Sequence, residues 1–489
     1  MTSQGSSRAA LWYTHVPMSA AATQQARAIP LIGEAPPSAA GPLEAHVPLV
    51  LPPARELPRL LQTLRFGMRP MSFNLSARRE LGDVWQVQLM SRAGQFVVTS
   101  HPDHVESLFK AKPDEAPSLT GESPLRPILG PNSVLTSVGA RHMRQRKLLL
   151  PPFHGEAVER YVKMISEVAE REIASWPIGE PFPLVPRMQA VTLAVIMGGI
   201  FGIEGTPERG SVEGRLSSTI RRFTRVAAHP SWQLVELRNL GREEARGALR
   251  AMLKVVDRDL FAVIAKRRAT DNDEAGDDVL SLLLATRDED GRPLGDEELR
   301  DELLTLVLAG HETTANSLAW TIERLLRTPA AYERLRSAVR GEGGDAEEEV
   351  EAAIHEGMRV RPVVPMVVRM VTRPWRLGQY VVPAETPVAV SIVALHHRED
   401  VYPEPHAFRP ERFLGRKPGT YTWIPFGGGI RRCLGATLAM AEQRVVLRAI
   451  IARADLQAPE PAAEQARQRN VTMIPRRGSR VVVLNKLVE

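Results

Sequence analysis

The chain contains a single cysteine, Cys433, which stands in the glycine-rich loop Phe426-Gly427-Gly428-Gly429-Ile430-Arg431-Arg432-Cys433-Leu434-Gly435. One cysteine cannot form an internal disulfide, an iron–sulfur cluster or a cysteine-rich zinc site, each of which needs several thiolates. The glycines allow the positive φ angles of a tight turn and let the backbone approach a flat cofactor. Cys433 is therefore a buried spectator, a nucleophile, or one ligand to a metal that other groups complete.

A second group of polar residues lies in the centre of a long apolar helix. Leucine spacing predicts this helix from Asp296, as its N-cap, to Arg327, a length of about 48 Å. Its centre reads Leu308-Ala309-Gly310-His311-Glu312-Thr313-Thr314-Ala315. Polar groups in a core helix cost free energy unless they are paired or used, although hydroxyls often only bond to the preceding turn. A zinc-protease motif is excluded, because alanine stands where H-E-x-x-H needs its second histidine.

A third pair, Glu356 and Arg359, is three residues apart on a helix that we expect to begin after Asp345 and to end at Pro362. Taken alone, such a pair is most often a solvent-exposed ion pair.

With these three segments in order, the sequence resembles the cytochrome P450 family of haem-thiolate monooxygenases, in its soluble bacterial form. The loop matches the family's F-x-x-G-x-x-x-C-x-G pattern, and residues 309–314 resemble its A-G-x-[D/E]-T-[T/S] signature. Glu356 and Arg359 resemble its E-x-x-R pair, and Phe408-Arg409-Pro410-Glu411-Arg412-Phe413 follows in the family's order. The resemblance runs from about Val47 to the C-terminus.

The resemblance implies a role for each of these residues. Cys433 would be the axial ligand to the iron of haem b, in a loop shaped by Phe426, Gly429 and Gly435. We expect its sulfur at the start of a helix, where the dipole and backbone N–H groups favour a thiolate. Glu312 and Thr313 would be the catalytic acid and alcohol over the distal face, and Gly310 would leave room for oxygen there. A buried network of Glu356, Arg359 and Arg412 would support the haem loop.

The haem propionates need cationic or hydrogen-bonding partners. By motif position the candidates are His142, Arg146, Arg369 and Arg431. His142 replaces the aromatic residue of the family's W-x-x-x-R helix.

The predicted fold is mainly α with a small β-sheet region: a cytochrome P450 fold with a long central helix over the haem. Residues 155–340 have helical spacing, and period-two segments surround residues 83–89, 371–392, 471–474 and 481–484. We expect residues 1–45 to be a disordered extension and residues 46–489 to form the haem-thiolate monooxygenase domain. Residues 188–203 are too short to span a membrane and contain Gln189 and Thr192, so we expect a core helix, no membrane span and a cytoplasmic monomer.

The implied reaction is hydroxylation or epoxidation of an apolar compound such as a fatty acid, terpenoid or steroid, with O2 and two electrons. No flavin extension or iron–sulfur ligand set is visible, so we expect an external ferredoxin or flavodoxin with an NAD(P)H-dependent reductase. The net charge of +6 is modest, and no basic run with interleaved aromatics predicts nucleic-acid binding. A basic docking surface is predicted from Arg141, Arg144, Lys147, Arg432, Arg416 and Lys417.

Two alternatives remain. One is a haem-thiolate peroxygenase or an isomerase on the same fold, although peroxide-driven members typically lack the acid–alcohol pair. The other is a haem-based gas sensor that does not catalyse a reaction. The predicted substrate pocket draws on residues 125–135, 212–240, 309–310, 363–367 and 471–474.

Overall fold

The computed structural model describes residues 31–44, 47–90, 94–119, 125–153, 155–205, 207–208, 210–229, 232–239, 242–269 and 278–487. Most of these residues are helical, which confirms the predicted fold class. The principal helices are α1 (Arg59–Met68), α2 (Pro70–Leu81), α3 (Pro102–Lys110), α4 (Arg126–Leu129), α5 (Gly139–Leu149), α6 (Glu156–Ala174), α7 (Leu184–Phe201), α8 (Val212–Ala228), α9 (Trp232–Asn239), α10 (Ala248–Arg268), α11 (Val279–Ala285), α12 (Asp296–Leu326), α13 (Pro329–Val339), α14 (Ala346–Val360), α15 (Ile392–His396) and α16 (Ala436–Arg453).

The strands form small sheets from distant parts of the chain. Their bounds are β1 (Ala40–Pro42), β2 (Val84–Gln88), β3 (Gln95–Thr99), β4 (Phe182–Pro183), β5 (Met366–Val371), β6 (Trp375–Leu377), β7 (Tyr380–Val382), β8 (Thr386–Ser391), β9 (Ala454–Gln457), β10 (Ala466–Arg469), β11 (Thr472–Pro475) and β12 (Arg480–Lys486). The sheet orders are β1-β6-β7, β2-β3-β8-β5, β4-β12-β9 and β10-β11. In the four-stranded sheet, β3 and β8 are parallel and the other pairs are antiparallel.

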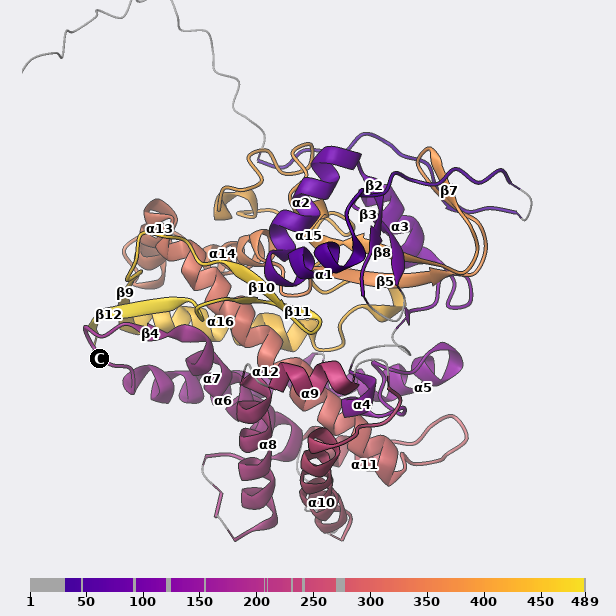
Figure 1. Ribbon diagram of the computed structural model, residues 1–489. Coiled ribbons are helices and arrows are strands. Elements are labelled where there is room, and N and C mark those ends of the chain that lie inside the picture. The colour runs from indigo at the N-terminus through magenta and orange to yellow at the C-terminus, as the bar shows by residue number, and fades with distance from the viewer. Residues whose placement is uncertain are drawn as a thin grey trace, which may run out of the picture.

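Helix α12 runs through the middle of the molecule, between the sheets near α1 and α2 and the pair formed by α8 and α10 (Figure 1). It begins one residue earlier than predicted, because Gly295 rather than Asp296 is the N-cap, and the Gly295 N–H donates to the Glu298 carboxylate at 3.2 Å. Helix α7 packs along α12, and the Thr192 hydroxyl donates to the His311 carbonyl oxygen at 2.7 Å. The polar residue inside the most apolar stretch therefore ties this helix to the central one.

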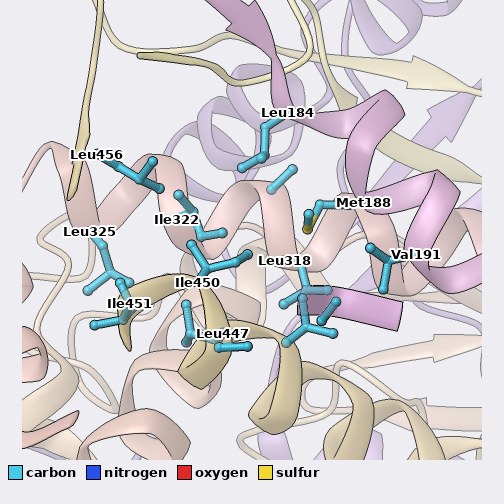
Figure 2. Close-up of a cluster of buried hydrophobic side chains, with 14 of the residues drawn as sticks. Leu184, Met188, Val191, Leu318, Ile322, Leu325, Leu447, Ile450, Ile451 and Leu456 are labelled. Atoms are coloured by element: carbon cyan, nitrogen blue, oxygen red, sulfur yellow. The ribbon is translucent and has the colours of Figure 1, made fainter. Parts of the chain in front are cut away.

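The largest core cluster surrounds the C-terminal half of α12 (Figure 2). Leu318 and Ile322 of α12 meet Leu184 and Met188 of α7, and α16 contributes Ile450. Burial of such side chains stabilises the fold by roughly 1.5–3 kcal/mol each. The core thereby fixes the positions of α12 and α16, the two helices that carry or follow the candidate chemical residues.

The first described segment, residues 31–44, already contacts this domain, whereas we predicted a boundary between residues 45 and 46. Strand β1 pairs with β6, and the Leu31 carbonyl oxygen accepts a hydrogen bond from Arg412 at 2.6 Å. Residues 1–30, which make up most of the predicted extension, lie outside the described residues.

One helix among the described residues, Leu184–Phe201, has the length and apolar composition to cross a membrane, and 61% of it is buried inside the protein. A core helix passes the same test, and the contacts of α7 with α12 are those of a core helix.

Candidate active site

Cys433 lies in a loop between a short 3₁₀ turn, Gly429–Arg431, and α16. Its N–H donates to the Phe426 carbonyl oxygen at 3.0 Å and closes the loop. Gly427 and Gly429 take φ angles of 65° and 63°, which favour glycine. The helix begins only at Ala436, with Gly435 as N-cap. The prediction that Cys433 itself opens the helix is therefore wrong by three residues.

The glycines of the loop differ in what surrounds them. A Cβ added at Gly428 would collide with the Phe109 ring, and one at Gly429 would collide with the Phe109 carbonyl oxygen. These two positions therefore allow α3 to pack directly on the loop. A Cβ at Gly435 would meet no described atom within 4 Å, so the loop borders open space on the side next to Cys433.

The Cys433 thiol is accessible to solvent, yet desolvation by the surrounding protein is the main cause that raises its pKa. These two observations place the sulfur on the wall of an internal space rather than on the outer surface. The Gly435 N–H and the charges of Arg146 and Arg432 act in the opposite direction and lower this pKa. In the protein without a bound metal, the effect of burial on this pKa is larger than the effect of these groups, so the thiol is favoured. This result differs from the expected preference for a thiolate. A bound metal cation would reverse this balance, because a coordinating thiol is deprotonated.

The central part of α12 presents an accessible stripe in the middle of the protein. Ala309 is exposed, and Leu306, Gly310 and Thr313 are partly accessible at helical spacing, although Leu303 and Leu318 are fully buried. Leu306 packs against the same hydrophobic cluster as Leu434, the neighbour of Cys433. The stripe and the cysteine loop therefore lie at one hydrophobic cluster.

The alcohol and the glycine of this stripe have structural contacts that the sequence did not reveal. The Thr313 hydroxyl donates to the Ala309 carbonyl oxygen at 2.6 Å. A Cβ at Gly310 would lie 2.7 Å from the Ile196 Cδ1 atom of α7. Close packing of α7 against α12 thus gives a structural reason for the glycine, and the predicted room for oxygen stays a prediction.

Glu312 forms an ion pair that the sequence analysis did not predict: its Oε1 atom lies 3.4 Å from Nη1 of Arg469 in β10. The same guanidinium donates to the Ala227 carbonyl oxygen at the end of α8. Glu236 of α9 is close to both charges: burial raises its pKa, Arg469 lowers it and Glu312 raises it. The signal that could have found Arg469 is the Arg-x-Arg strand at 467–469, directly before the predicted pocket segment 471–474.

The four predicted propionate contacts gather in one place. Burial and the nearby charges of Arg431, Arg146 and Arg369 lower the pKa of His142 to about 4. Desolvation lowers the pKa of Arg369 to about 10. Desolvation and the charges of Arg369 and Arg146 lower the pKa of Arg431 to about 10. Within the described part of the chain, none of the three arginines has a carboxylate at ion-pair distance. Such uncompensated positive charge suits an anionic ligand.

These arginines also hold the loop. Arg431 donates to the carbonyl oxygens of Val134, at 3.1 Å, and of Ser137. Arg146 of α5 donates to the Arg432 carbonyl oxygen at 2.7 Å. Each guanidinium has five N–H groups, so donors remain for a ligand carboxylate.

Glu356, Arg359 and Arg412 have no exposed side-chain surface. Arg359 binds Glu356 through two bonds, at 2.6 and 2.7 Å, and the Arg412 Nε atom lies 3.4 Å from Glu356. Arg359 also donates to the carbonyl oxygens of His396, Pro405 and Ala407. The network thus joins α14 to the segments that precede the cysteine loop.

Part of the predicted basic surface is neutralised. Arg144 pairs with Asp288 at 3.0 Å and with Glu298 at 3.2 Å, and Lys147 pairs with Glu289 at 2.7 Å. Of the predicted cations, Arg416, Lys417 and Arg432 are exposed and have no ion pair within the described ranges. The surface is therefore less basic than residue counting suggested.

A solvent-accessible thiol in a glycine loop, an acid and an alcohol on a central helix, and three arginines without a carboxylate partner in the described ranges form the arrangement predicted for a haem-thiolate site. Comparison with known proteins agrees: residues 51–481 match the cytochrome P450 family model, and the chain belongs to this family.

The chain is 38% identical to cytochrome P450 137 of Mycobacterium tuberculosis over 406 residues, which cover 82% of this chain and 83% of that protein. It is 36% identical to cytochrome P450 135B1 of Mycobacterium bovis, covering 88% of this chain and 91% of that protein. A solved structure described as retinoic acid-bound cyanobacterial CYP120A1 shares the fold, with a TM-score of 0.73, 22% identity and coverage of 90% of this chain and all of the other. The cytochrome P450DA haem domain has a TM-score of 0.73 at 21% identity, covering 90% of this chain and 98% of that one.

Membership of the family makes the protein a haem-thiolate monooxygenase and implies a haem cofactor, a substrate, O2 and redox partners in general. The residues present fit haem. Cys433 offers sulfur to the iron, the open side of Gly435 leaves room for a flat group, and His142, Arg146, Arg369 and Arg431 offer donors to two carboxylates.

Proposed function

We propose that this protein oxidises an apolar small molecule with electrons from a separate ferredoxin or flavodoxin and its NAD(P)H-dependent reductase. The observation that carries this proposal is the accessible stripe around Ala309 in an otherwise buried helix, since its Leu306 packs against the same hydrophobic cluster as Leu434, the neighbour of Cys433. Aliphatic residues at the predicted pocket positions, including Val367 and Ile474, suit an apolar substrate. One structure of similar fold is described with bound retinoic acid, whose body is largely hydrocarbon.

The haem, when bound, supplies oxygen activation, and the thiolate ligand favours cleavage of the O–O bond. Cys433 would hold the iron, and the three arginines together with the His142 imidazole would hold the propionates. On α12, the Thr313 hydroxyl would exchange its bond to the Ala309 carbonyl oxygen for one to a ligand bound there. Glu312 can pass a proton towards that hydroxyl once it leaves Arg469.

We further propose that electrons enter near Arg432, which adjoins Cys433 and is exposed. Its positive charge and those of Arg416 and Lys417 would attract an acidic donor protein. Monomeric state and cytoplasmic location are predictions that accompany this proposal.

The experiment is to purify the protein with haem and record its carbon monoxide difference spectrum. NAD(P)H consumption and product formation are then compared, with surrogate ferredoxin and reductase against peroxide alone. Turnover only with the redox partners supports the monooxygenase. Equal or faster turnover with peroxide would favour the peroxygenase, and a ligand-responsive haem without turnover would favour the gas sensor.

A further inference from the structure

The β10–β11 hairpin presents two guanidinium groups on one face. Arg467 and Arg469 are two residues apart in β10, and successive side chains of a strand alternate between its faces. Their cross-strand partners, Ile474 and Thr472, are buried and belong to the same face. The opposite face carries Met473, whose carbonyl oxygen accepts a hydrogen bond from the Trp320 indole of α12 at 3.3 Å.

This face adjoins the candidate active site. Arg469 contacts Glu312 at the centre of α12, and Arg467 lies about 7 Å further along the strand. Strand β10 also packs against α1, which exposes Leu60, Leu61 and Leu64. Arg467 thus lies between the acid of the central helix and an apolar surface.

Arg467 differs from its neighbour Arg469 because no carboxylate of the described residues pairs with it. Its guanidinium forms no hydrogen bond or ion pair within the described part of the chain, and its Nε atom is buried without a partner. Desolvation and the charges of Arg469 and Arg476 lower its pKa. The three predicted propionate arginines also lack a carboxylate partner and have lowered pKa values. A desolvated guanidinium of this kind gains from a bidentate carboxylate.

We propose that Arg467 is the binding site for the carboxylate of the substrate, and that the substrate is therefore an amphipathic acid with an apolar tail. Arg469 provides a second positive charge on the same face, and Ile474 offers apolar contact. The tail would extend towards the stripe around Ala309. This inference rests on the proposed monooxygenase function and names the substrate class for it.

The test uses the haem-loaded protein and matched probes: saturated carboxylic acids of eight to sixteen carbons and the primary alcohols of equal chain length. Binding is measured by titration of the haem spectrum. We expect the wild type to bind the best acid about ten-fold more tightly than its alcohol, the gain from one charge-assisted hydrogen bond. Acetate should not compete, because a free anion lacks the tail.

Arg467→Gln is expected to bring the acid-to-alcohol ratio to about 1 while the alcohol still binds. Arg448→Gln, which removes an exposed arginine of α16, is the matched control and should leave the ratio unchanged. Equal binding of acid and alcohol by the wild type, absence of binding by both series, or an unchanged ratio in Arg467→Gln would overturn the proposal. An intact thiolate-type spectrum and turnover of another apolar compound would then show that only the substrate class is wrong.

Discussion

Glu312, the acid of the central helix, is in ion-pair contact with Arg469 of the C-terminal hairpin at 3.4 Å. Their side chains are only 22% and 12% exposed, so solvent screens this pair less than a surface pair. The contact joins two elements more than 150 residues apart and ties the candidate proton donor to the segment that borders the substrate pocket.

Arg469→Gln should release Glu312 and lower the fraction of NAD(P)H electrons that reach product, because the acid loses the charge that orients it. Glu236 should then bind protons more readily, since Arg469 lowers its pKa. The measurements are the ratio of product to NAD(P)H consumed and its pH profile. The exposed Arg476→Gln variant is the control, and a ratio and profile identical to wild type would contradict the orienting role.

Glu312→Gln and Thr313→Ala should each slow product formation about 100-fold or more, the usual contribution of a positioned acid. Haem content should stay unchanged. Thr313→Ser keeps the hydroxyl that donates to Ala309, so it separates loss of the alcohol from loss of a helical bond. Full activity in both Glu312→Gln and Thr313→Ala would remove these residues from the catalytic step.

Cys433→Ala should abolish the thiolate-type carbon monoxide spectrum, because no second cysteine exists to replace the ligand. The spectrum of the purified variant, after haem reconstitution, is the measurement. Survival of the spectrum would overturn the assignment of the axial ligand.

Arg359→Ala should destabilise the protein by about 3–5 kcal/mol, because it leaves the Glu356 carboxylate buried with one arginine at 3.4 Å. Haem retention should fall with it. The surface pair of Lys163 with Glu167 provides the control, where Lys163→Ala should cost under about 1 kcal/mol. Chemical unfolding and haem content measure both effects, and equal stability of the two variants would contradict the buried network.

Glu442 of α16 is a buried acid with one oxygen that has no partner among the described residues, and burial raises its pKa to about 8. The folded protein holds Glu442 in its neutral form, whereas the unfolded chain ionises it above the ordinary pKa of 4.5. The free energy of unfolding therefore falls as the pH rises from 4.5 to about 8. Glu442→Gln should therefore match the wild type near pH 4.5 and be more stable by roughly 1–4 kcal/mol at pH 8. Denaturant titrations at both pH values test this, with the exposed Glu297→Gln as control. A gain that is the same at both pH values would contradict it.

Electron transfer from an acidic ferredoxin should weaken as salt rises. Because Arg144 and Lys147 already have acidic partners, Arg432→Gln should raise the KM for the ferredoxin more than Arg144→Gln does. Turnover that is indifferent to ionic strength would end the electrostatic docking hypothesis.

The sequence by itself determined the parts of this protein that depend on local spacing. A lone cysteine among glycines, an acid and alcohol in an apolar helix and the E-x-x-R pair identified the family, and periodicity placed α12 to within one residue at each end. These features are local because turns and helices are specified by neighbouring residues.

Only the tertiary structure decided which charges are paired. It placed Arg469 next to Glu312, gave acidic partners to Arg144 and Lys147, and left Arg467 without one in the part of the chain that the structure describes. It also showed that Gly310 serves the contact with Ile196 and that burial raises the pKa of Cys433. Each of these depends on segments far apart in the chain, because the energy of a charge is set by the groups and solvent around it in space.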